Sequence, residues 1–147
     1  SRMIRTSFVP KEHVDLCWGQ IEEYLKGAAD YTHGRYEVND IYWAIVDYDH
    51  HLWIAFDDQQ IKGAVVTNIV NYPRKRYLCM SFCGGVELEK WKDPMLNMLQ
   101  HWAFDNHCDG IEATARPGWA KIFKDDGHVP LWRTFELPAG NKGLKDG

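Results

Sequence analysis

Apolar residues recur along this chain with two different periods, and the change of period separates its elements. Before residue 50, the apolar side chains are spaced by three or four positions, which is typical of amphipathic helices. This spacing predicts a helix over residues 14–25 and a shorter helix over residues 38–48. A short strand over residues 3–9, ended by Pro10, is expected before them.

From residue 52 the period becomes two, the spacing of β-strands. Residues 52–56 and 63–70 flank the polar turn 57–60, and this arrangement predicts a β-hairpin. A third strand over residues 77–83 is apolar on both faces, as expected for the centre of a sheet. Two glycines, Gly84 and Gly85, end it.

The third helix carries the clearest boundary signals. Asp93 is a suitable N-cap, Pro94 suits the first helical position, and Gly110 stands just past the expected end. A short strand over residues 111–115 follows. Strand, helix and strand of this length form a right-handed parallel crossover.

A short helix over residues 117–127 and a last strand over residues 129–137 complete the chain. The predicted order is β-α-α-β-β-β-α-β-α-β, an α/β fold with a mixed sheet and a central βαβ unit. Residues 1–138 are expected to form a single domain. Residues 139–147 are polar and rich in glycine, so we expect a flexible tail.

Composition narrows the class of protein. The chain has 147 residues with 17 Lys and Arg against 21 Asp and Glu, a formal net charge of −4, which argues against general nucleic-acid binding. Aromatic residues make up 14% of the chain, so we expect a well-filled core or an aromatic-lined cleft. The apolar runs are too short for a membrane-spanning helix, and the first residues lack a signal peptide. The sequence therefore predicts a cytoplasmic protein.

Cysteines and histidines do not form a metal-binding pattern. No two cysteines have the short paired spacing of a structural zinc site, and we expect buried thiols and no bound metal. The adjacent His50 and His51 lie between a helical and a strand-like segment, which favours a solvated turn. The four cysteines are Cys17, Cys79, Cys83 and Cys108.

A set of motifs in the second half of the chain resembles a known family. Gly84-Gly85 ends a strand, a helix with Trp91 and Trp102-Ala103 follows, and Arg116-Pro117-Gly118-Trp119 comes after the next strand. Together they resemble the GNAT family of N-acetyltransferases, and in particular small GNAT-like proteins of bacteriophages and prophages. The resemblance covers residues 53–137.

The resemblance implies an acyl-CoA site where two parallel strands splay apart. In GNAT enzymes, pantetheine pairs with the first of these strands and the pyrophosphate lies at the N-terminus of the next helix, where unpaired N–H groups favour an anion. The splayed strands here would be 77–83 and 111–115. The residues that this mapping assigns to acetyl-CoA or another acyl-CoA are Phe82, Cys83, Gly84, Gly85, Lys90, Trp91 and Lys92.

Two features depart from the enzyme pattern. The segment 86–93 contains no glycine and carries three acids, whereas the usual phosphate loop is rich in glycine. Phe123 stands where many GNAT enzymes have a tyrosine that protonates the leaving thiolate. Tyr72 and Tyr77, on other strands, are candidates to replace it.

Two residues are expected at the reacting end. Glu112, in a short predicted strand, is either a general base or a partner in a structural ion pair. Arg116 is either a fork for a phosphate or carboxylate, or a loop arginine stacked on Trp119.

Two functions fit these observations. The first is an acyl-CoA-dependent N-acyltransferase that modifies an amine, encoded by a phage or prophage. The second is a catalytically silent GNAT-like protein with a structural, virion-associated or host-interaction role, favoured by the altered phosphate loop and by Phe123.

Overall fold

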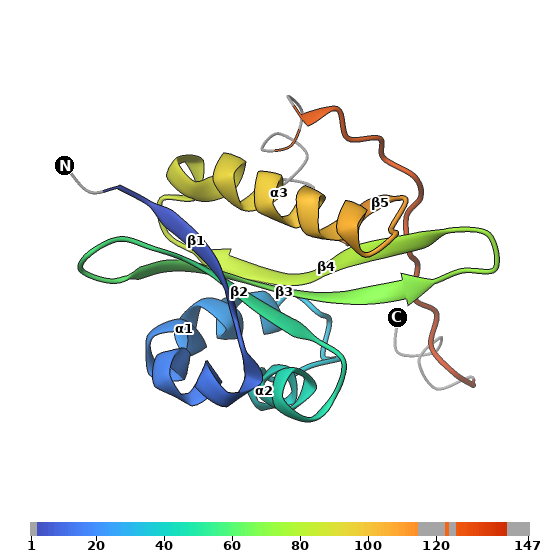
Figure 1. The fold of residues 1–147 in the computed structure, drawn as a ribbon. Coiled ribbons are helices and arrows are strands. Elements are labelled where there is room, and N and C mark those ends of the chain that lie inside the picture. Colours follow the sequence, from blue (N-terminus) through green and yellow to red (C-terminus); the bar gives the residue numbers. More distant parts are fainter. Residues whose placement is uncertain (1–2, 115–122, 124–125, 141–147) are drawn as a thin grey trace. The chain divides into compact units, whose positions relative to one another are not determined.

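The computed structural model describes residues 3–114, 123 and 126–140. The chain forms two compact units, residues 1–114 and 115–147. All helices and strands labelled in Figure 1 belong to the first unit.

A five-stranded mixed sheet forms the centre of the first unit, with the strand order β1-β2-β3-β4-β5 (Figure 1). The pairs from β1 to β4 are antiparallel, whereas β4 and β5 are parallel. The crossover between β4 and β5 is a helix, as expected for neighbouring parallel strands. The bounds are Arg5–Val9 (β1), His51–Phe56 (β2), Ile61–Asn71 (β3), Arg76–Gly85 (β4) and Gly110–Ala113 (β5).

Helices cover both faces of this sheet (Figure 1). α1 (Val14–Ala29), which follows the 3₁₀ turn η1 (Lys11–His13), and α2 (Val38–Asp47) pack on one face. α3 (Leu88–Asp105) packs on the other face. The sheet therefore separates an α1/α2 side from an α3 side.

Each side has its own buried core. On the α1/α2 side, the apolar stripes of both helices meet Leu52, Ala64 and Val66 of the sheet, and all of these side chains are buried. On the α3 side, Trp53 is only 2% exposed and its ring packs edge-on against Trp102. Burial of large apolar side chains on both faces is the main stabilising contribution.

Most of the predicted elements are confirmed, with boundaries that shift by a few residues. The helices predicted from the three-to-four spacing, the hairpin, the central strand and the parallel crossover are all present. α2 begins with a reciprocal cap, in which the Glu37 side chain and the Asp40 side chain each bond the other residue's backbone N–H.

The predicted start of the third helix is wrong. α3 begins at Leu88, so Asp93 is not its N-cap and Pro94 lies inside the helix. Trp91 explains the earlier start, because its side chain is 1% exposed and its indole N–H donates to the carbonyl of Val86 at 2.8 Å. Burial of this large side chain outweighs the local signals at residues 93–94.

The last two predicted elements concern the second unit. The helix predicted over residues 117–127 lies mostly outside the described residues. The strand predicted over residues 129–137 is wrong, because residues 128–138 have neither helical nor strand structure. Large apolar side chains in this segment, such as Trp132 and Phe135, are exposed, and the segment has no partner in the described sheet. Without a paired neighbour, alternating apolar residues do not form a strand.

Candidate functional site

β4 continues beyond its pairing with β5. The parallel register runs from Tyr77 opposite Gly110 to Met80 opposite Ala113, and there it ends. The last five residues of β4, 81–85, therefore have no β5 partner among the described residues. This stretch of β4 is an edge beyond the β5 register, and a strand edge can pair with an extended ligand.

A β-bulge at Ser81 marks the point where the two strands separate. Met80 lies opposite Thr67 of β3 and Phe82 lies opposite Val66, so Ser81 has no counterpart. The bulge reverses the alternation of side chains, because Thr67 and Val66 point to opposite faces of the sheet. Met80 thus faces α3, whereas Phe82 packs in the core on the α1/α2 side.

The β4 residues that the resemblance assigns to acyl-CoA lie along this edge. Phe82 is 6% exposed and its ring meets that of Tyr36 at a centroid distance of 5.0 Å, while Cys83 is half-buried. A Cβ at Gly84 would lie 2.2 Å from the backbone oxygen of Tyr24. Gly85 has a φ of +153°, and its Cβ would lie 2.4 Å from the Lys62 oxygen. The fold itself therefore requires both glycines.

The beginning of α3 holds a cluster of paired charges. Glu87, immediately before α3, accepts from Lys62 at 2.5 Å and from Lys90 at 2.7 Å. These two hydrogen bonds lower the pKa of Glu87 from 4.5 to about 2. Lys62 is only 7% exposed, and its Nζ lies 3.9 Å from Asp57, which is also buried. Two lysines and two carboxylates give this cluster no net charge.

The three α3 residues that the resemblance assigns to acyl-CoA differ in their surroundings. Lys90 is mostly exposed, and Lys92 lies 3.5 Å from Asp93. Trp91 is buried, and a Cβ at Gly63 would lie 2.2 Å from its ring. Trp91 thus holds the first turn of α3 against β3, while the side chain of Lys90 is 60% exposed and that of Lys92 only 17%.

Of the two residues predicted near the reacting groups, the structure describes Glu112. Glu112 lies opposite Cys79 in the β4–β5 register and accepts a hydrogen bond from the Tyr72 hydroxyl at 2.8 Å. This bond is the main cause of the raised pKa of Tyr72. Arg116 lies outside the described residues. The structure therefore pairs Glu112 with a tyrosine, one residue before β4 and β5 separate.

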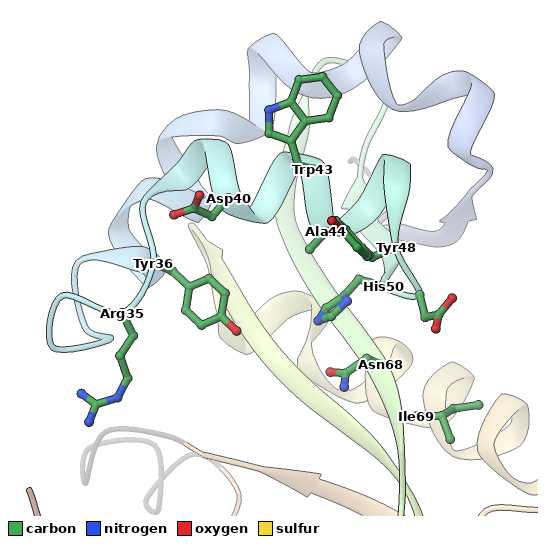
Figure 2. Close-up of a pocket in the computed structure, with 10 residues that line it drawn as sticks. Arg35, Tyr36, Asp40, Trp43, Ala44, Tyr48, His50, Asn68 and Ile69 are labelled. Atoms are coloured by element: carbon green, nitrogen blue, oxygen red, sulfur yellow. The ribbon is translucent and has the colours of Figure 1, made fainter.

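A pocket of about 720 Å³ opens on the α1/α2 side of the sheet (Figure 2). It lies between α2, the loop before α2 and β3. The pocket adjoins the bulge, because Asn68 in its wall accepts a hydrogen bond from the Ser81 hydroxyl and Tyr36 contacts Phe82. Its lining residues are Arg35, Tyr36, Asp40, Trp43, Ala44, Tyr48, Asp49, His50, Asn68 and Ile69.

His50 is not in the solvated turn predicted from the sequence. Its side chain lies in the wall of the pocket between Tyr48 and Asn68 (Figure 2), and its Nδ1 is buried with no hydrogen-bond partner in the described part of the chain. Burial lowers the pKa of His50, and the nearby ammonium group of Lys11 lowers it further, against an opposing effect of Asp49. The imidazole is therefore uncharged at neutral pH.

The pocket is the part of the site that the sequence did not reveal. Its residues come from the loop before α2, from α2, from the turn after α2 and from β3. No fixed spacing links such positions, since only the packing of α2 on the sheet brings them together. The one available signal was the concentration of Trp and Tyr before residue 50, which is consistent with the expected aromatic-lined cleft.

The described residues contain neither a metal-binding cluster nor a membrane-spanning helix. No group of three or more His, Cys, Asp or Glu side chains there is arranged to hold a metal ion. Within the same residues, every helix is too short or too polar to cross a membrane.

Comparison with known proteins identifies the fold. No protein-family model matches the chain, and no curated protein does. Among solved structures, an aminoglycoside N-acetyltransferase in complex with CoA has a TM-score of 0.68 and 15% identity, covering 94% of this chain and 95% of that one. A ribosomal-protein-alanine N-acetyltransferase from Brucella melitensis has a TM-score of 0.68 and 12% identity, with 93% and 99% covered. A predicted acetyltransferase with acetyl-CoA from Clostridium acetobutylicum has a TM-score of 0.66 and 13% identity, with 92% and 96% covered. The chain has the GNAT fold.

Proposed function

We propose that this protein is an acyl-CoA-dependent N-acyltransferase, with acetyl-CoA as the first donor to test. The observation that carries the proposal is the open edge of β4 at residues 81–85, which begins at the bulge and ends beside the start of α3. The pocket on the α1/α2 side reaches the same bulge through Asn68 and Tyr36. The α1/α2 side of the sheet thus offers a pocket for the amine acceptor. This pocket lies next to the edge of β4, which fits an extended acyl-CoA.

The described residues fit acyl-CoA at its pantetheine end. Residues 81–85 extend beyond the register that pairs β4 with β5, and the amides of pantetheine could pair with the backbone of this part of β4. At the phosphate end, the positive side chains at the beginning of α3 are the exposed Lys90, paired with Glu87, and the largely buried Lys92, paired with Asp93. Glu87 offsets part of that charge, so this end is weaker than a glycine-rich phosphate loop.

When bound, acyl-CoA would supply a thioester whose carbonyl carbon accepts the amine nitrogen. The new C–N bond replaces the C–S bond, and the ammonium form of the acceptor releases two protons, one to solvent before attack and one that ends on the sulfur. Backbone N–H groups at the Ser81 bulge can polarise the carbonyl oxygen. Tyr72 carries its phenolic proton at neutral pH, as tyrosines ordinarily do, and its pKa is raised further by the hydrogen bond to Glu112; it is our candidate donor of the proton to sulfur. Glu112 orients it.

The site residues that remain proposals follow from this arrangement. Phe82, Cys83, Gly84 and Gly85 would form the donor edge. Lys90 and Lys92 would contact the phosphates, with Trp91 supporting their turn. We place the reaction in the cytoplasm, which is consistent with four cysteines that form no disulfide.

Calorimetric titration with acetyl-CoA, CoA and S-acetylpantetheine tests donor binding. We expect micromolar binding of acetyl-CoA and weaker binding of S-acetylpantetheine, which lacks the phosphates. Lys90→Glu should weaken acetyl-CoA binding about fivefold and leave S-acetylpantetheine unchanged. Lys26→Glu is the matched control, because Lys26 is equally exposed and also pairs with a nearby acid, Asp30. No binding of acetyl-CoA or CoA at millimolar concentration would overturn the proposal.

A second candidate is a catalytically silent GNAT-like protein with a structural or host-interaction role, of phage or prophage origin. The specific observation in its favour is the paired Glu87, a carboxylate at the N-terminus of α3, where the family binds a pyrophosphate. The titration separates the two candidates, because a silent protein has no reason to retain affinity for acetyl-CoA.

A further inference from the structure

Glu87 places its carboxylate between two ammonium groups at the beginning of α3. One oxygen accepts a hydrogen bond from Nζ of Lys62 at 2.5 Å, and the other accepts one from Nζ of Lys90 at 2.7 Å. The side chain of Lys62, which comes from β3, is only 9% exposed, whereas that of Lys90 is 60% exposed. Two ammonium groups that bracket the oxygens of one anion form an arrangement that also suits a phosphate.

The backbone of Glu87 is in the left-handed region, with a φ of +54° and a ψ of +41°. This region is unfavourable for residues that carry a Cβ. Glu87 is also the N-cap residue of α3, a position from which side-chain oxygens often accept from the N–H groups of the first turn. Its side chain makes no such capping bond within the described residues. The ion pairs with the two lysines, and not the requirements of the helix, therefore hold the carboxylate where it is.

The cluster becomes positive when the Glu87 carboxylate leaves it. Nζ of Lys62 lies 3.9 Å from the buried carboxylate of Asp57, so Asp57, Glu87, Lys62 and Lys90 together carry no net charge. Without the Glu87 carboxylate, the other three groups carry a net charge of about +1 at neutral pH. One third of the Glu87 side chain is already exposed, so it can turn into solvent without a rearrangement of the core. The vacated place then favours another anion.

We propose that Glu87 is an internal competitor of the donor, because its carboxylate occupies the place between Lys62 and Lys90 that the diphosphate of acyl-CoA takes on binding. This inference rests on the proposed transferase function. It also assigns Lys62 to the donor site, a role that neither the resemblance nor the edge of β4 indicates. On binding, the two lysines exchange a carboxylate for a phosphate and Glu87 turns into solvent. Glu87 thereby sets the affinity for donors that carry phosphates and leaves the contacts of pantetheine with β4 unchanged.

Calorimetric titration of Glu87→Gln with acetyl-CoA and with S-acetylpantetheine tests the competition. We expect acetyl-CoA to bind about tenfold more tightly to Glu87→Gln than to the wild type, because the uncharged amide competes poorly with a phosphate. The affinity for S-acetylpantetheine, which lacks the diphosphate, should not change. Glu89→Gln is the matched control, because Glu89 is exposed in the first turn of α3 and its replacement removes the same charge. This control should change the affinity for acetyl-CoA by about twofold or less.

Two lysine variants in the Glu87→Gln background test the ammonium groups. Lys90→Met and Lys62→Gln should each remove most of the tenfold gain in affinity for acetyl-CoA. Glutamine at position 62 keeps a hydrogen-bond donor for the buried Asp57, and Lys90 is exposed, so both variants are designed to preserve the fold. Urea unfolding at pH 7 should show Glu87→Gln to be less stable than the wild type, so that stability and donor affinity change in opposite directions. A Glu87 that is only structural would not raise the affinity on replacement.

The outcome for Glu87 is distinguishable from that for the transferase. Equal affinity of wild type and Glu87→Gln for acetyl-CoA, or an equal gain for S-acetylpantetheine, overturns the competition and leaves the transferase proposal standing. Inorganic diphosphate is the probe for the opposite case. If neither protein binds acetyl-CoA while diphosphate binds Glu87→Gln about tenfold more tightly than the wild type, the transferase is refuted and the competition of Glu87 with an anion is supported.

Discussion

Replacement of Gly63 by alanine tests how the first turn of α3 is fixed to the sheet. Gly63 lies in β3, directly beneath the ring of Trp91. An added Cβ would lie 2.2 Å from Cζ2 of that ring, 2.6 Å from Cε2 and 2.8 Å from Cη2. The ring is 1% exposed and its N–H is bonded to the carbonyl of Val86, so it has no free space into which it can move.

The expected cost follows from overpacking. Extra methyl groups in a well-packed core destabilise a protein by about 1–3 kcal/mol. Alanine also restricts the unfolded chain, which offsets the cost by about 0.5–1 kcal/mol. Three ring atoms within 2.8 Å place Gly63→Ala toward the upper end of the range. Gly19→Ala is the matched control, because a Cβ at Gly19 in α1 meets nothing within 4 Å. That variant should be more stable by about 0.5–1 kcal/mol.

Urea unfolding, followed by circular dichroism, measures both effects as shifts of the midpoint. A double variant, Gly63→Ala with Trp91→Phe, gives the sharper test, since phenylalanine lacks the outer indole ring that carries Cζ2 and Cη2. The double variant should lose less stability than the sum of the two single variants. Strict additivity, or a Gly63→Ala protein as stable as the wild type, would refute the packing argument.

Three further predictions use the same unfolding and titration assays. Because the pKa of Glu87 is lowered to about 2, its ion pairs stabilise the fold above pH 4.5. This contribution is lost as the pH falls toward 2. The difference in unfolding free energy between wild type and Glu87→Gln should therefore shrink between pH 7 and pH 3. Thr67→Val should cost about 1–3 kcal/mol, because buried Trp53 loses the acceptor of its indole N–H at 2.9 Å, whereas Thr67→Ser keeps the hydroxyl and should cost less. The phenol of Tyr72 should ionise at a higher pH than an ordinary tyrosine because its pKa is raised, and Glu112→Gln should move its ultraviolet titration back toward the ordinary value.

Much of the fold could be predicted because most elements carry their own periodic signal. α1 and the β2–β3 hairpin have apolar positions at the spacing of their secondary structure, and packing on the sheet confirms both. The start of α3 could not be predicted in this way. The local signals at Asp93 and Pro94 are strong, but the position of Trp91 in the core decides where the helix begins. A tertiary contact with Gly63, which is 28 residues earlier, is absent from any local pattern.

In the candidate site, too, some features could be predicted from the sequence and others depend on tertiary packing. The open edge of β4 could be predicted from the strand order and the resemblance, and the register bears out its geometry. The role of those residues in binding stays a prediction. His50 could not be predicted, because a histidine between a helix and a strand is usually solvated. Its burial depends on the packing of α2 against β3, which places Asn68 and Tyr48 around it.

The bulge at Ser81 is what makes one strand serve both halves of the proposed reaction. Without it, the side chains of Met80 and Phe82 would face the same side of the sheet, and Phe82 would not reach Tyr36. With it, β4 contributes to the α3 core before the bulge and to the α1/α2 side after it, while Ser81 itself bonds Asn68 in the pocket wall. The register also ends its pairing with β5 one residue before Ser81, so the same irregularity lies at the open edge. A donor on that edge and an acceptor in the pocket would therefore meet at Ser81. The sequence marks this position with no glycine or proline, since the register of three strands creates it.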